Sequence, residues 1–389
     1  MPRIMRIAYC TNVRIPSERA HGHQIAQVCD ALAALGHEVK VFHPYRKNAV
    51  KEDYWTYHGA DKRVKLQTIG AYDFIGSPLP GVLKLWVMNW YLRRMLPQFL
   101  SETPFDLLYT RTPALLAPLL ATGQKTILEL HQLPRRSRAM FVAQCNNCLV
   151  VAALTSSMRD TLIEWGVHPE KVMIAGDAVD IARFASLPSQ AAARIALGIR
   201  TPRPVVGYVG RLTTLGMEKG VAEVLAAVAR TKGKPRPWFA LIVGGPENDR
   251  RRYEQLARKY DLGADDVCFT GAVESDRVPV ALAACDALAM PFPDLPHYRF
   301  AMSPLKMFEY MAACKPIVTS DLPTIRDVLS EDTAFFCPPG DAQCLAARLE
   351  EIADMPAEAA KRAHKALELV KAHHTWEERM KGILERLDF

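Results

Sequence analysis

The sequence predicts an α/β protein built from two Rossmann-like, doubly wound domains. Three observations lead to this class. The chain has 389 residues, more than one ordinary hydrophobic core organises. Its hydrophobic content of 49% and charged content of 23% are typical of a globular protein. Short apolar runs alternate with segments of helical periodicity, and this order produces parallel sheets with right-handed crossovers.

The first half begins with a short apolar run followed by a polar loop. A helix comes next, with apolar residues from Ile25 to Leu35, and it stops at Gly36. A strand follows directly, so a parallel strand–helix–strand unit is expected. The predicted strands of this half span 6–10, 37–42, 107–109, 126–130, 148–151 and 171–174.

The region 180–204 contains three prolines and a glycine and is predicted to be a linker. After it the alternation starts again. Strands are expected at 205–209, 239–243, 267–269 and 287–290, and helices at 221–229, 253–260 and 278–285. In open parallel sheets ligands bind beyond the carboxyl ends of the strands, so the residues that follow each strand are the first candidates for a site.

The stretch 302–318 reads as a loop, a helix and a strand. Ser303 is a suitable N-cap, and Pro304 suits the first helical position. The free N–H groups of a helix N-terminus attract phosphate, and Glu309 lies within reach of a sugar hydroxyl beside it. Most capped helices bind no ligand, so phosphate binding at this helix becomes a useful hypothesis only with support from the rest of the chain.

Glycines and cations follow the strands of the second half. Gly210 and Arg211 come after the strand at 205–209, a flexible stretch is expected next, and Lys219 precedes a helix. Gly244 and Gly271 follow two other strands. The two cations are interpreted as a clamp on a diphosphate, or alternatively as an ordinary charged loop. Neither G-x-G-x-x-G nor a P-loop is present, which disfavours a nicotinamide enzyme and excludes a P-loop kinase.

Net charge and cysteine usage give broader limits. The net charge of +7 favours acidic partners without choosing among nucleotide, phospholipid and nucleic acid. The nine scattered cysteines suit a reducing compartment. The single C-x-x-C at Cys145 and Cys148 has no partner pair, so a zinc site is disfavoured and a redox role is the weaker alternative. No signal peptide or spanning segment is recognised, and a cytoplasmic location is expected.

The motifs together resemble those of the retaining GT-B glycosyltransferases of family 4. They lie at 207–212 with 219–220, at 243–245, 269–271, 303–312 and 338–341, and in the first half at 21–22, 36–39, 129–131 and 179–180. The resemblance implies two domains facing a central cleft. An acceptor-side domain would span 1–183 with a returning helix at 374–389, and a nucleotide-sugar-binding domain would span 184–373.

The resemblance also implies roles for individual residues. The catalytic set would be Arg211, Lys219 and His131, with the two cations on the donor diphosphate and the histidine on the donor sugar; a purely structural histidine is the alternative. The donor-binding set would be Gly22, Gly210, Gly244, Gly271, Ser303, Leu305 and Glu309. Pro304 supplies no N–H where many relatives have one. Many relatives also carry a second glutamate eight residues before the ribose-binding one, but Ala301 stands there. Sugar recognition is then expected from the backbone of 300–302 and from Ser303.

The implied reaction moves a sugar from a nucleotide-sugar to an acceptor with retention of configuration. A UDP-sugar is favoured over a GDP-sugar, and the nucleotide-sugar is a co-substrate, so no cofactor is expected. The chain has no D-x-D motif, and no metal is expected because the two cations would replace it. Two alternatives stay open: an epimerase acting on the nucleotide-sugar, and a non-catalytic nucleotide-binding partner.

The acceptor is less defined. Arg14, Arg111, Arg135, Arg136 and Arg138 are interpreted as a basic pocket for a phosphorylated acceptor, or alternatively as a solvated basic turn. The apolar segment 83–99 carries Lys84, Arg93 and Arg94, and fits either an interfacial helix on anionic lipid or a helix packed into its domain. The expected protein visits the inner membrane leaflet, uses a lipid-linked or anionic acceptor in cell-surface glycan synthesis, and does not bind nucleic acid. A small-molecule acceptor without membrane contact is the alternative.

Overall fold

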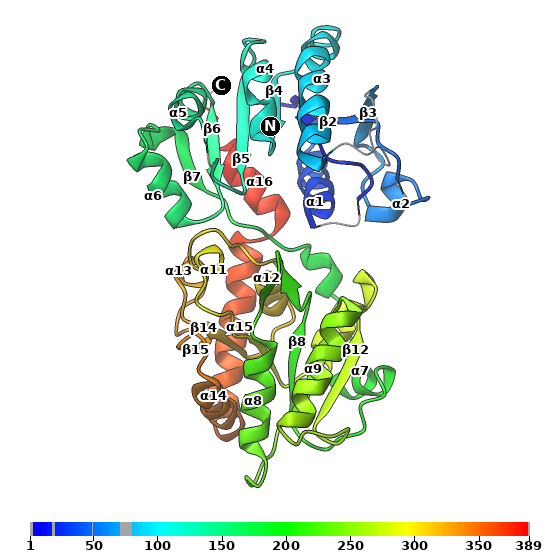
Figure 1. The fold of residues 1–389 in the computed structure, drawn as a ribbon, viewed down its shortest axis with the longest axis vertical. Helices are drawn as coiled ribbons and strands as arrows, with labels where there is room; N and C mark the ends of the chain where they lie inside the picture. Colours follow the sequence, from blue (N-terminus) through cyan, green and yellow to red (C-terminus); the bar gives the residue numbers. More distant parts are fainter. Residues whose placement is uncertain (1–2, 18–19, 49, 71–79, 135, 388–389) are drawn as a thin grey trace. The chain divides into compact units, whose positions relative to one another are not determined.

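The computed structural model describes residues 3–17, 20–48, 50–70, 80–134 and 136–387. The chain divides into two compact units. Unit 1 comprises 1–176 and 376–389, and unit 2 comprises 177–375. Each unit is built around one parallel sheet with helices on its faces (Figure 1), so the predicted α/β class with two Rossmann-like domains is confirmed.

The sheet of unit 1 has seven strands in the order β3-β2-β1-β4-β5-β6-β7, and all neighbouring pairs are parallel. Apart from Arg6 at the start of β1, its central strands are buried, as expected for strands inside a parallel sheet. The strands are β1 (Arg6–Cys10), β2 (Glu38–Pro44), β3 (Lys65–Ile69), β4 (Leu107–Thr110), β5 (Thr126–Leu130), β6 (Val150–Ala153) and β7 (Val172–Ile174).

The helices of unit 1 include one from the far end of the chain. Arg379 of this last helix donates a hydrogen bond to Glu129 of β5, and the helix therefore returns to unit 1 as expected. The helices are α1 (Ala20–Ala34), α2 (Tyr54–His58), α3 (Gly81–Ser101), α4 (Leu116–Leu120), α5 (Arg138–Asn146), α6 (Ser156–Glu164) and α16 (Trp376–Leu384), with 3₁₀ turns at η1 (Pro113–Leu115) and η2 (Pro169–Lys171).

Helix α3 packs on unit 1 through a stripe with a spacing of four residues: Met88, Leu92, Leu96 and Leu100 are buried. They join a core cluster with residues of β1, β2 and β4. Packing of the segment 83–99 into its domain is thus correct for this face of the helix. The first turns of the helix also carry apolar side chains that are exposed to solvent.

The main sheet of unit 2 has six parallel strands in the order β12-β11-β8-β13-β14-β15. Alternate residues of β8 join different core clusters, Val205 and Val209 on one face and Val206 and Tyr208 on the other. The strands are β8 (Val205–Val209), β11 (Phe239–Val243), β12 (Val267–Gly271), β13 (Ala287–Met290), β14 (Ile317–Ser320) and β15 (Phe335–Cys337), and a separate ribbon is formed by β9 (Thr213–Thr214) and β10 (Met217–Glu218).

Helices cover both faces of this sheet. Helices α8 and α14 lie side by side on the face that carries Tyr208 (Figure 1), while α12 and α15 belong to the core of the other face. The helices are α7 (Gln190–Ala196), α8 (Val221–Thr231), α9 (Glu247–Lys259), α10 (Val278–Ala283), α11 (Pro296–Phe300), α12 (Leu305–Ala312), α13 (Pro323–Arg326), α14 (Ala342–Asp354) and α15 (Pro356–His373), with 3₁₀ turns at η3 (Ile181–Phe184) and η4 (Ser275–Arg277).

The division between the units differs from the predicted domain limits. The sequence suggested 1–183 with 374–389, whereas unit 1 ends at Gly176 and resumes at Trp376. The reason is packing: the backbone N–H of Val179 donates to the carbonyl of His374 at 2.9 Å, and Val179 and Phe184 are buried in the core of unit 2. The segment that looked like the end of the first domain is thus part of the second.

In each sheet the strands are added first toward one edge and then toward the other, and the strand order shows where this reversal occurs. In unit 2 this point lies between β8 and β13, and in unit 1 between β1 and β4. Ligands of doubly wound sheets bind at the carboxyl edge near such a point. Of the helices in the described residues, none has the length and apolarity that a bilayer-spanning segment needs.

Candidate functional site

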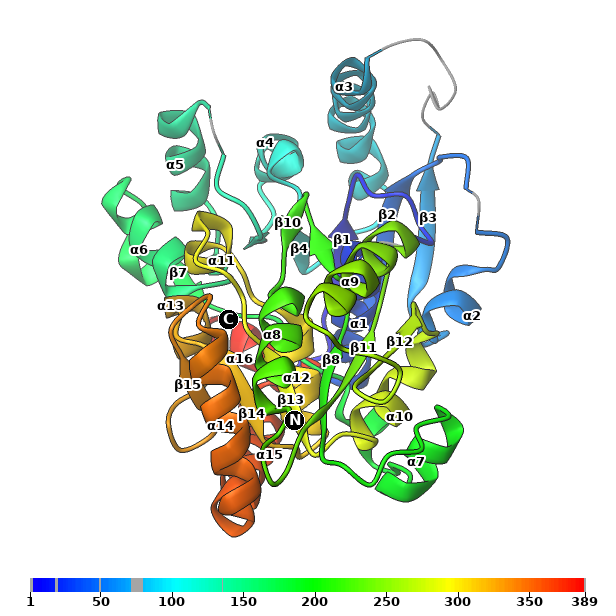
Figure 2. The same ribbon diagram turned by 60° about the horizontal axis from the view of Figure 1, so that its bottom comes forward.

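A hairpin follows β8 where the sequence suggested a flexible stretch. Thr213 pairs with Glu218 and Thr214 with Met217, and Leu215 and Gly216 both have positive φ, of 53° and 76°. Two successive positive φ angles are typical of the tightest hairpin turns. The hairpin brings the chain back on itself just before α8 begins (Figure 2), so Arg211 and Lys219 flank the same carboxyl end of β8.

Glycines permit close backbone contacts along this edge. Gly210 has φ 140°, and its N–H donates to Val243 O at 2.9 Å. Gly244 donates to Gly271 O at 2.8 Å, and a Cβ at Gly244 would lie 1.9 Å from Gly210 O. No side chain fits at Gly244, and positive φ also favours glycine at Gly271. Gly210, Gly244 and Gly271, the three glycines predicted to bind the donor, therefore lie in a row at the ends of β8, β11 and β12. This row of backbone is the glycine ledge.

The two predicted phosphate cations interact electrostatically. Arg211 is exposed, and its carbonyl accepts a hydrogen bond from the Tyr208 hydroxyl at 2.8 Å. Burial lowers the pKa of Lys219 to about 8, and the nearby positive charge of Arg211 adds to the effect. Gly220, directly after Lys219, has no room for a side chain, because a Cβ would lie 1.9 Å from Pro291 O at the end of β13. The lysine is thus held at the reversal point of the sheet.

The start of α12 differs in detail from the prediction. Pro304, not Ser303, occupies the N-cap position, and no side chain caps the helix. Ser303 instead accepts a hydrogen bond from the Asp177 N–H at 2.7 Å. The serine hydroxyl is therefore already hydrogen-bonded to the backbone at the start of unit 2. Leu305 is the first helical residue. The uncapped N–H groups of this turn remain suited to an anion.

Glu309 faces a partner that the sequence did not suggest. Its Oε1 lies 3.7 Å from a guanidinium nitrogen of Arg183, which also donates to the Ser275 hydroxyl at 3.0 Å. Burial raises the pKa of Glu309, while Arg183 and Lys306 act in the opposite direction. Ala301, where many relatives carry glutamate, follows the short α11 and is partly exposed. Arg183 lies in a 3₁₀ turn over a hundred residues away, so no local signal could reveal it.

Lys306 is a further residue that the sequence analysis did not select. It lies in the first turn of α12, is only 7% exposed, and its Nζ has no hydrogen-bond partner in the described part of the chain. The ammonium sits 3.5 Å from the centre of the Tyr208 ring. A lysine within the apolar run 305–308 was the available signal, because charged residues are rarely buried without a partner.

In unit 1, His131 belongs to a buried polar network. Its Nε2 is hydrogen-bonded to Oε1 of Glu129, while Oε2 of Glu129 accepts from Tyr109 and from Arg379 at 3.1 Å. Burial alone would raise the pKa of Glu129, but Arg379, His131 and Arg111 hold it well below its usual range. The carboxylate therefore fixes the orientation of the His131 ring, whose side chain is 17% exposed.

Gly22 and the arginines near the reversal point of the first sheet are placed as follows. Gly22 lies in the first turn of α1, where a Cβ would come within 2.7 Å of Ser17 O. Arg111 follows β4 and donates to Gln24 of α1 at 2.6 Å. Arg14 is half-buried in the loop after β1. The end of β4 is thus joined to the start of α1 through Gln24, two residues after Gly22.

The second arginine group is dispersed. Arg138 begins α5 and stacks its guanidinium on the Trp165 ring, 4.3 Å from the ring centre. Arg136 is exposed in the preceding turn, and Arg135 lies outside the described residues. The packing of Arg138 on Trp165 supports the alternative of a surface turn at this position more than a pocket.

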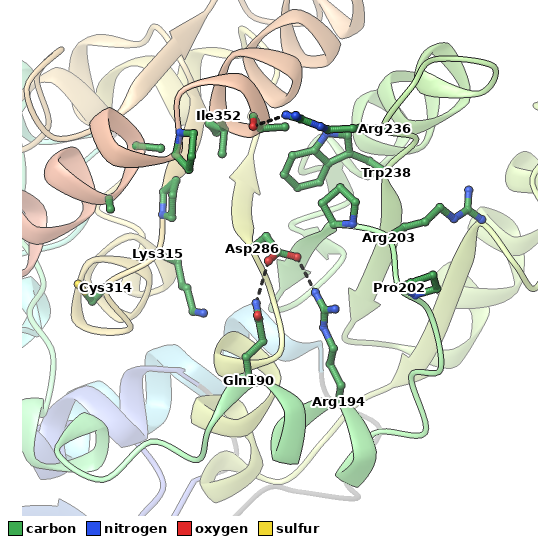
Figure 3. A pocket seen from close by; sticks show the side chains of 16 residues that line it. Gln190, Arg194, Pro202, Arg203, Arg236, Trp238, Asp286, Cys314, Lys315 and Ile352 are labelled. Atoms are coloured by element: carbon green, nitrogen blue, oxygen red, sulfur yellow. Dashed lines mark hydrogen bonds and ion pairs between the residues drawn. The ribbon is translucent and has the colours of Figure 1, made fainter.

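A cavity of about 650 Å³ lies at the opposite edge of the second sheet (Figure 3). It is lined by residues that precede the strands, among them Pro204, Asp286 and Pro316. Asp286 accepts hydrogen bonds from Gln190 at 3.0 Å and Arg194 at 2.5 Å. These charges already satisfy one another, and the cavity does not adjoin the glycine ledge.

The cysteines show no sign of redox chemistry. All nine are free. Burial raises the pKa of both Cys145 and Cys148, the latter to about 12, so neither is a reactive thiolate near neutral pH.

Two doubly wound units, one with a cation-flanked glycine ledge, define the architecture of the GT-B glycosyltransferases. Family comparison agrees: residues 22–183 match Glycosyltransferase Family 4, and residues 203–355 match Glycosyl transferases group 1. Each half of the chain thus matches a glycosyltransferase family model, and the two units together have the GT-B type of fold.

Curated relatives are similar over part of their length. A 2-deoxystreptamine N-acetyl-D-glucosaminyltransferase of Streptomyces fradiae is 30% identical over 200 residues, which cover 50% of this chain and 45% of the relative. A glycogen synthase of Mycobacterium tuberculosis is 28% identical over 226 residues, covering 57% and 50%. The chain therefore spans about half the length of the curated relatives it matches.

Solved structures share the whole fold. A glycosyltransferase from Rickettsia africae superimposes with a TM-score of 0.77 at 16% identity, covering 98% of this chain and 97% of the other. The sucrose-phosphate synthase of Thermosynechococcus elongatus gives 0.72 at 21% identity, covering 98% of each chain. The Anabaena protein HepE in complex with UDP gives 0.71 at 19% identity, covering 98% and 99%. At these identities the likeness concerns the fold.

Proposed function

We propose that this protein transfers a sugar from a nucleoside diphosphate sugar to an acceptor with retention of the anomeric configuration and without a metal. The observation that carries the proposal is the carboxyl edge of the second sheet. There a glycine ledge flanked by two cations lies beside the uncapped start of α12, the helix that carries Glu309. These groups suit a ribose linked to a diphosphate.

The chemistry follows from where charge develops. As the bond between the sugar C1 and the phosphate oxygen breaks, negative charge grows on the leaving diphosphate. Arg211 and Lys219 stabilise that charge, so their interaction is stronger in the transition state than with the bound donor. The acceptor oxygen bonds to C1 on the face that the leaving group vacates, and its proton passes to the phosphate oxygen. No protein nucleophile takes part in this scheme. His131, oriented by Glu129, is assigned to the donor sugar.

A UDP-sugar is the favoured donor and a GDP-sugar the second choice. The structural relative HepE has been solved with UDP and with UDP-glucose, which supports this order. Glu309 is assigned to the ribose hydroxyls. In place of the glutamate absent at Ala301, we assign sugar recognition to the backbone around 300–302, because Ser303 already accepts a hydrogen bond from Asp177.

The acceptor is assigned to unit 1, and a lipid-linked or anionic molecule in cell-surface glycan synthesis is favoured. Helix α3 supports a transient membrane contact: Trp86 is 63% and Trp90 54% exposed, and Arg93 and Arg94 are exposed on the following turn. Tryptophans next to cations suit the interface of an anionic leaflet. A small-molecule acceptor without membrane contact is the alternative.

A panel of nucleotides and nucleotide-sugars tests this assignment. UDP and UDP-sugars are expected to raise the melting temperature of the protein, and a matching UDP-sugar is expected to be hydrolysed slowly to UDP in the absence of acceptor. An epimer formed without acceptor would point to an epimerase, and binding without any turnover to a non-catalytic partner. If UDP, GDP and ADP all leave the melting temperature unchanged, the proposed donor site is wrong.

A further inference from the structure

We propose that Lys306 is a third cation of the donor site: a buried amine beneath the glycine ledge whose charge complements the diphosphate and adds to its affinity. The inference rests on the proposed donor site and names a residue that neither the motif resemblance nor the comparisons assign. It depends on three features of the geometry around this side chain.

The first feature is the position of the amine. An ideal Cβ on Gly210 would lie 3.1 Å from Cε and 3.3 Å from Nζ of Lys306. The lysine therefore reaches from the first turn of α12 to the carboxyl end of β8, where the first phosphate cations are found. Because Gly210 has no side chain, the amine lies close to the backbone at this edge of the sheet.

The second feature is the surroundings of the amine, which are aromatic rings and, among the described residues, contain no hydrogen-bonded carboxylate that would balance its charge. Nζ lies 3.5 Å from the centre of the Tyr208 ring and 5.6 Å from that of Phe292, and it makes no hydrogen bond to any described residue. Aromatic faces attract a cation but do not compensate the loss of water. The hydroxyl of the same Tyr208 holds the Arg211 carbonyl, so one ring connects two of the three cations.

The third feature is the mutual repulsion of the cations. Burial lowers the pKa of Lys306 well below its usual range, Lys219 lowers it further, and Glu309 on the next turn of α12 opposes the shift. The charged form of Lys306 is therefore disfavoured in the empty protein by burial and by the positive charge of Lys219. A bound diphosphate relieves this repulsion, which is the behaviour expected of a binding group and not of a group retained for stability.

The substitution Lys306→Met tests the proposal, since it keeps an unbranched side chain only one atom shorter and removes the charge. The dissociation constant for UDP, measured by calorimetry, is expected to rise at least about tenfold, the size of one lost charge-assisted contact. Affinity for uridine, measured by NMR titration, should stay unchanged because uridine has no phosphate. The melting temperature of the nucleotide-free variant should be equal or higher, because an unpaired buried charge is removed.

Lys315→Met is the matched control. Lys315 precedes β14 at the opposite edge of the same sheet, and its loss should leave UDP binding unchanged. Lys306→Gln provides a second variant if the methionine does not fold. An unchanged ratio of UDP to uridine affinity, or a lower melting temperature in both Lys306 variants, would overturn the proposal. Failure of the wild type to bind any nucleoside diphosphate would instead reject the donor site itself.

Discussion

Arg379 in the last helix of the chain donates a hydrogen bond to Oε2 of Glu129 at 3.1 Å, and both side chains are almost completely buried. Arg379 also donates to the carbonyls of Gly176 at 2.6 Å and Ala175 at 3.1 Å. One guanidinium thus binds the returning helix to β5 and to the last residues of the first segment of unit 1. It also holds the carboxylate that orients His131.

The first prediction concerns this pair. Arg379→Met leaves Glu129 buried without its strongest cation, and the free energy of unfolding should fall by about 3–5 kcal/mol. Urea denaturation followed by circular dichroism measures the loss. Arg386→Met, an exposed arginine just after the same helix, should change stability by less than about 0.5 kcal/mol. Adding Glu129→Gln to Arg379→Met should recover part of the loss, since no charge then remains buried; no recovery would contradict this account.

The same pair gives a dependence on acid. The pKa of Glu129 in the folded protein is well below the usual value of 4.5 for a glutamate, so the folded state binds fewer protons than the unfolded state around that pH. The contribution to stability is complete above the unfolded value and is lost as the pH falls through the lower, folded one. Wild-type stability should therefore decline below about pH 4.3, and the decline should be smaller in Arg379→Met.

The second prediction concerns turnover. Arg211→Ala should lower the rate of sugar transfer or donor hydrolysis by about 10²–10³, the usual effect of removing one group that stabilises developing charge. Arg236→Ala, an exposed arginine before β11, is the control and should leave the rate unchanged. The wild-type rate should survive EDTA. An absolute metal requirement would reject the proposed mechanism.

The third prediction uses the lowered pKa of Lys219, which is about 8. Above this pH the free protein loses the charge that meets the diphosphate, so the affinity for UDP should fall between pH 8 and 10. Lys219→Arg stays protonated throughout, and its affinity should fall less. The stability of the nucleotide-free protein should change in the opposite direction. The unfolded state binds more protons than the folded state across this window, so the free energy of unfolding rises with pH. An equal pH dependence in both proteins would assign the titration to another group.

The sequence predicted the strands best where they are short, continuous and apolar. The segments 6–10, 126–130, 205–209, 239–243 and 287–290 match β1, β5, β8, β11 and β13 residue for residue. Apart from Arg6 these segments are buried on both faces, so most of their residues are apolar and turn residues mark their ends. Strand β3 was missed because it lies at the sheet edge and alternates polar with apolar residues, a weaker pattern.

The site was predicted in part, and the parts that were missed depend on long-range contacts. Glycines and cations after strands are visible in sequence because the chemistry of backbone approach and phosphate binding requires those residue types. The partners Arg183 of Glu309 and Arg379 of Glu129 are separated from them by 126 and 250 residues. Nothing in the local pattern of either arginine distinguishes it from a surface cation. Ser303 was misplaced as the N-cap because its competing partner, the Asp177 N–H, is equally distant.

The fourth prediction concerns Glu309. Glu309→Ala should weaken UDP binding by about tenfold or more, since hydrogen bonds from hydroxyls to a carboxylate are lost. A UDP analogue without the 2′ and 3′ hydroxyls should bind the variant and the wild type equally, which separates recognition of the ribose from a general loss of structure. If Glu309→Ala weakens the binding of UDP and of the analogue equally, Glu309 does not bind the ribose hydroxyls.

The last prediction concerns helix α3 and the membrane. Its buried stripe from Met88 to Leu100 accounts for its packing on unit 1, but not for the apolar side chains on the outside of its first turns, where Val82 is 84% and Trp86 63% exposed. Each basic residue near an anionic surface contributes about 1 kcal/mol to attachment, so Lys84, Arg93 and Arg94 are enough for reversible binding.

Co-sedimentation with vesicles tests this contact. Binding to anionic vesicles is expected at low salt, with a steep decrease as salt screens the charges and little binding to neutral vesicles. Charge reversal of the three basic residues to glutamate should abolish it, while Arg386→Glu, outside the helix, should not. Trp86→Ser together with Trp90→Ser should reduce binding at every salt concentration, because the apolar contribution is not screened. If the wild type stays in the supernatant at low salt, the acceptor must be reached without a membrane, and a small soluble molecule becomes the favoured acceptor.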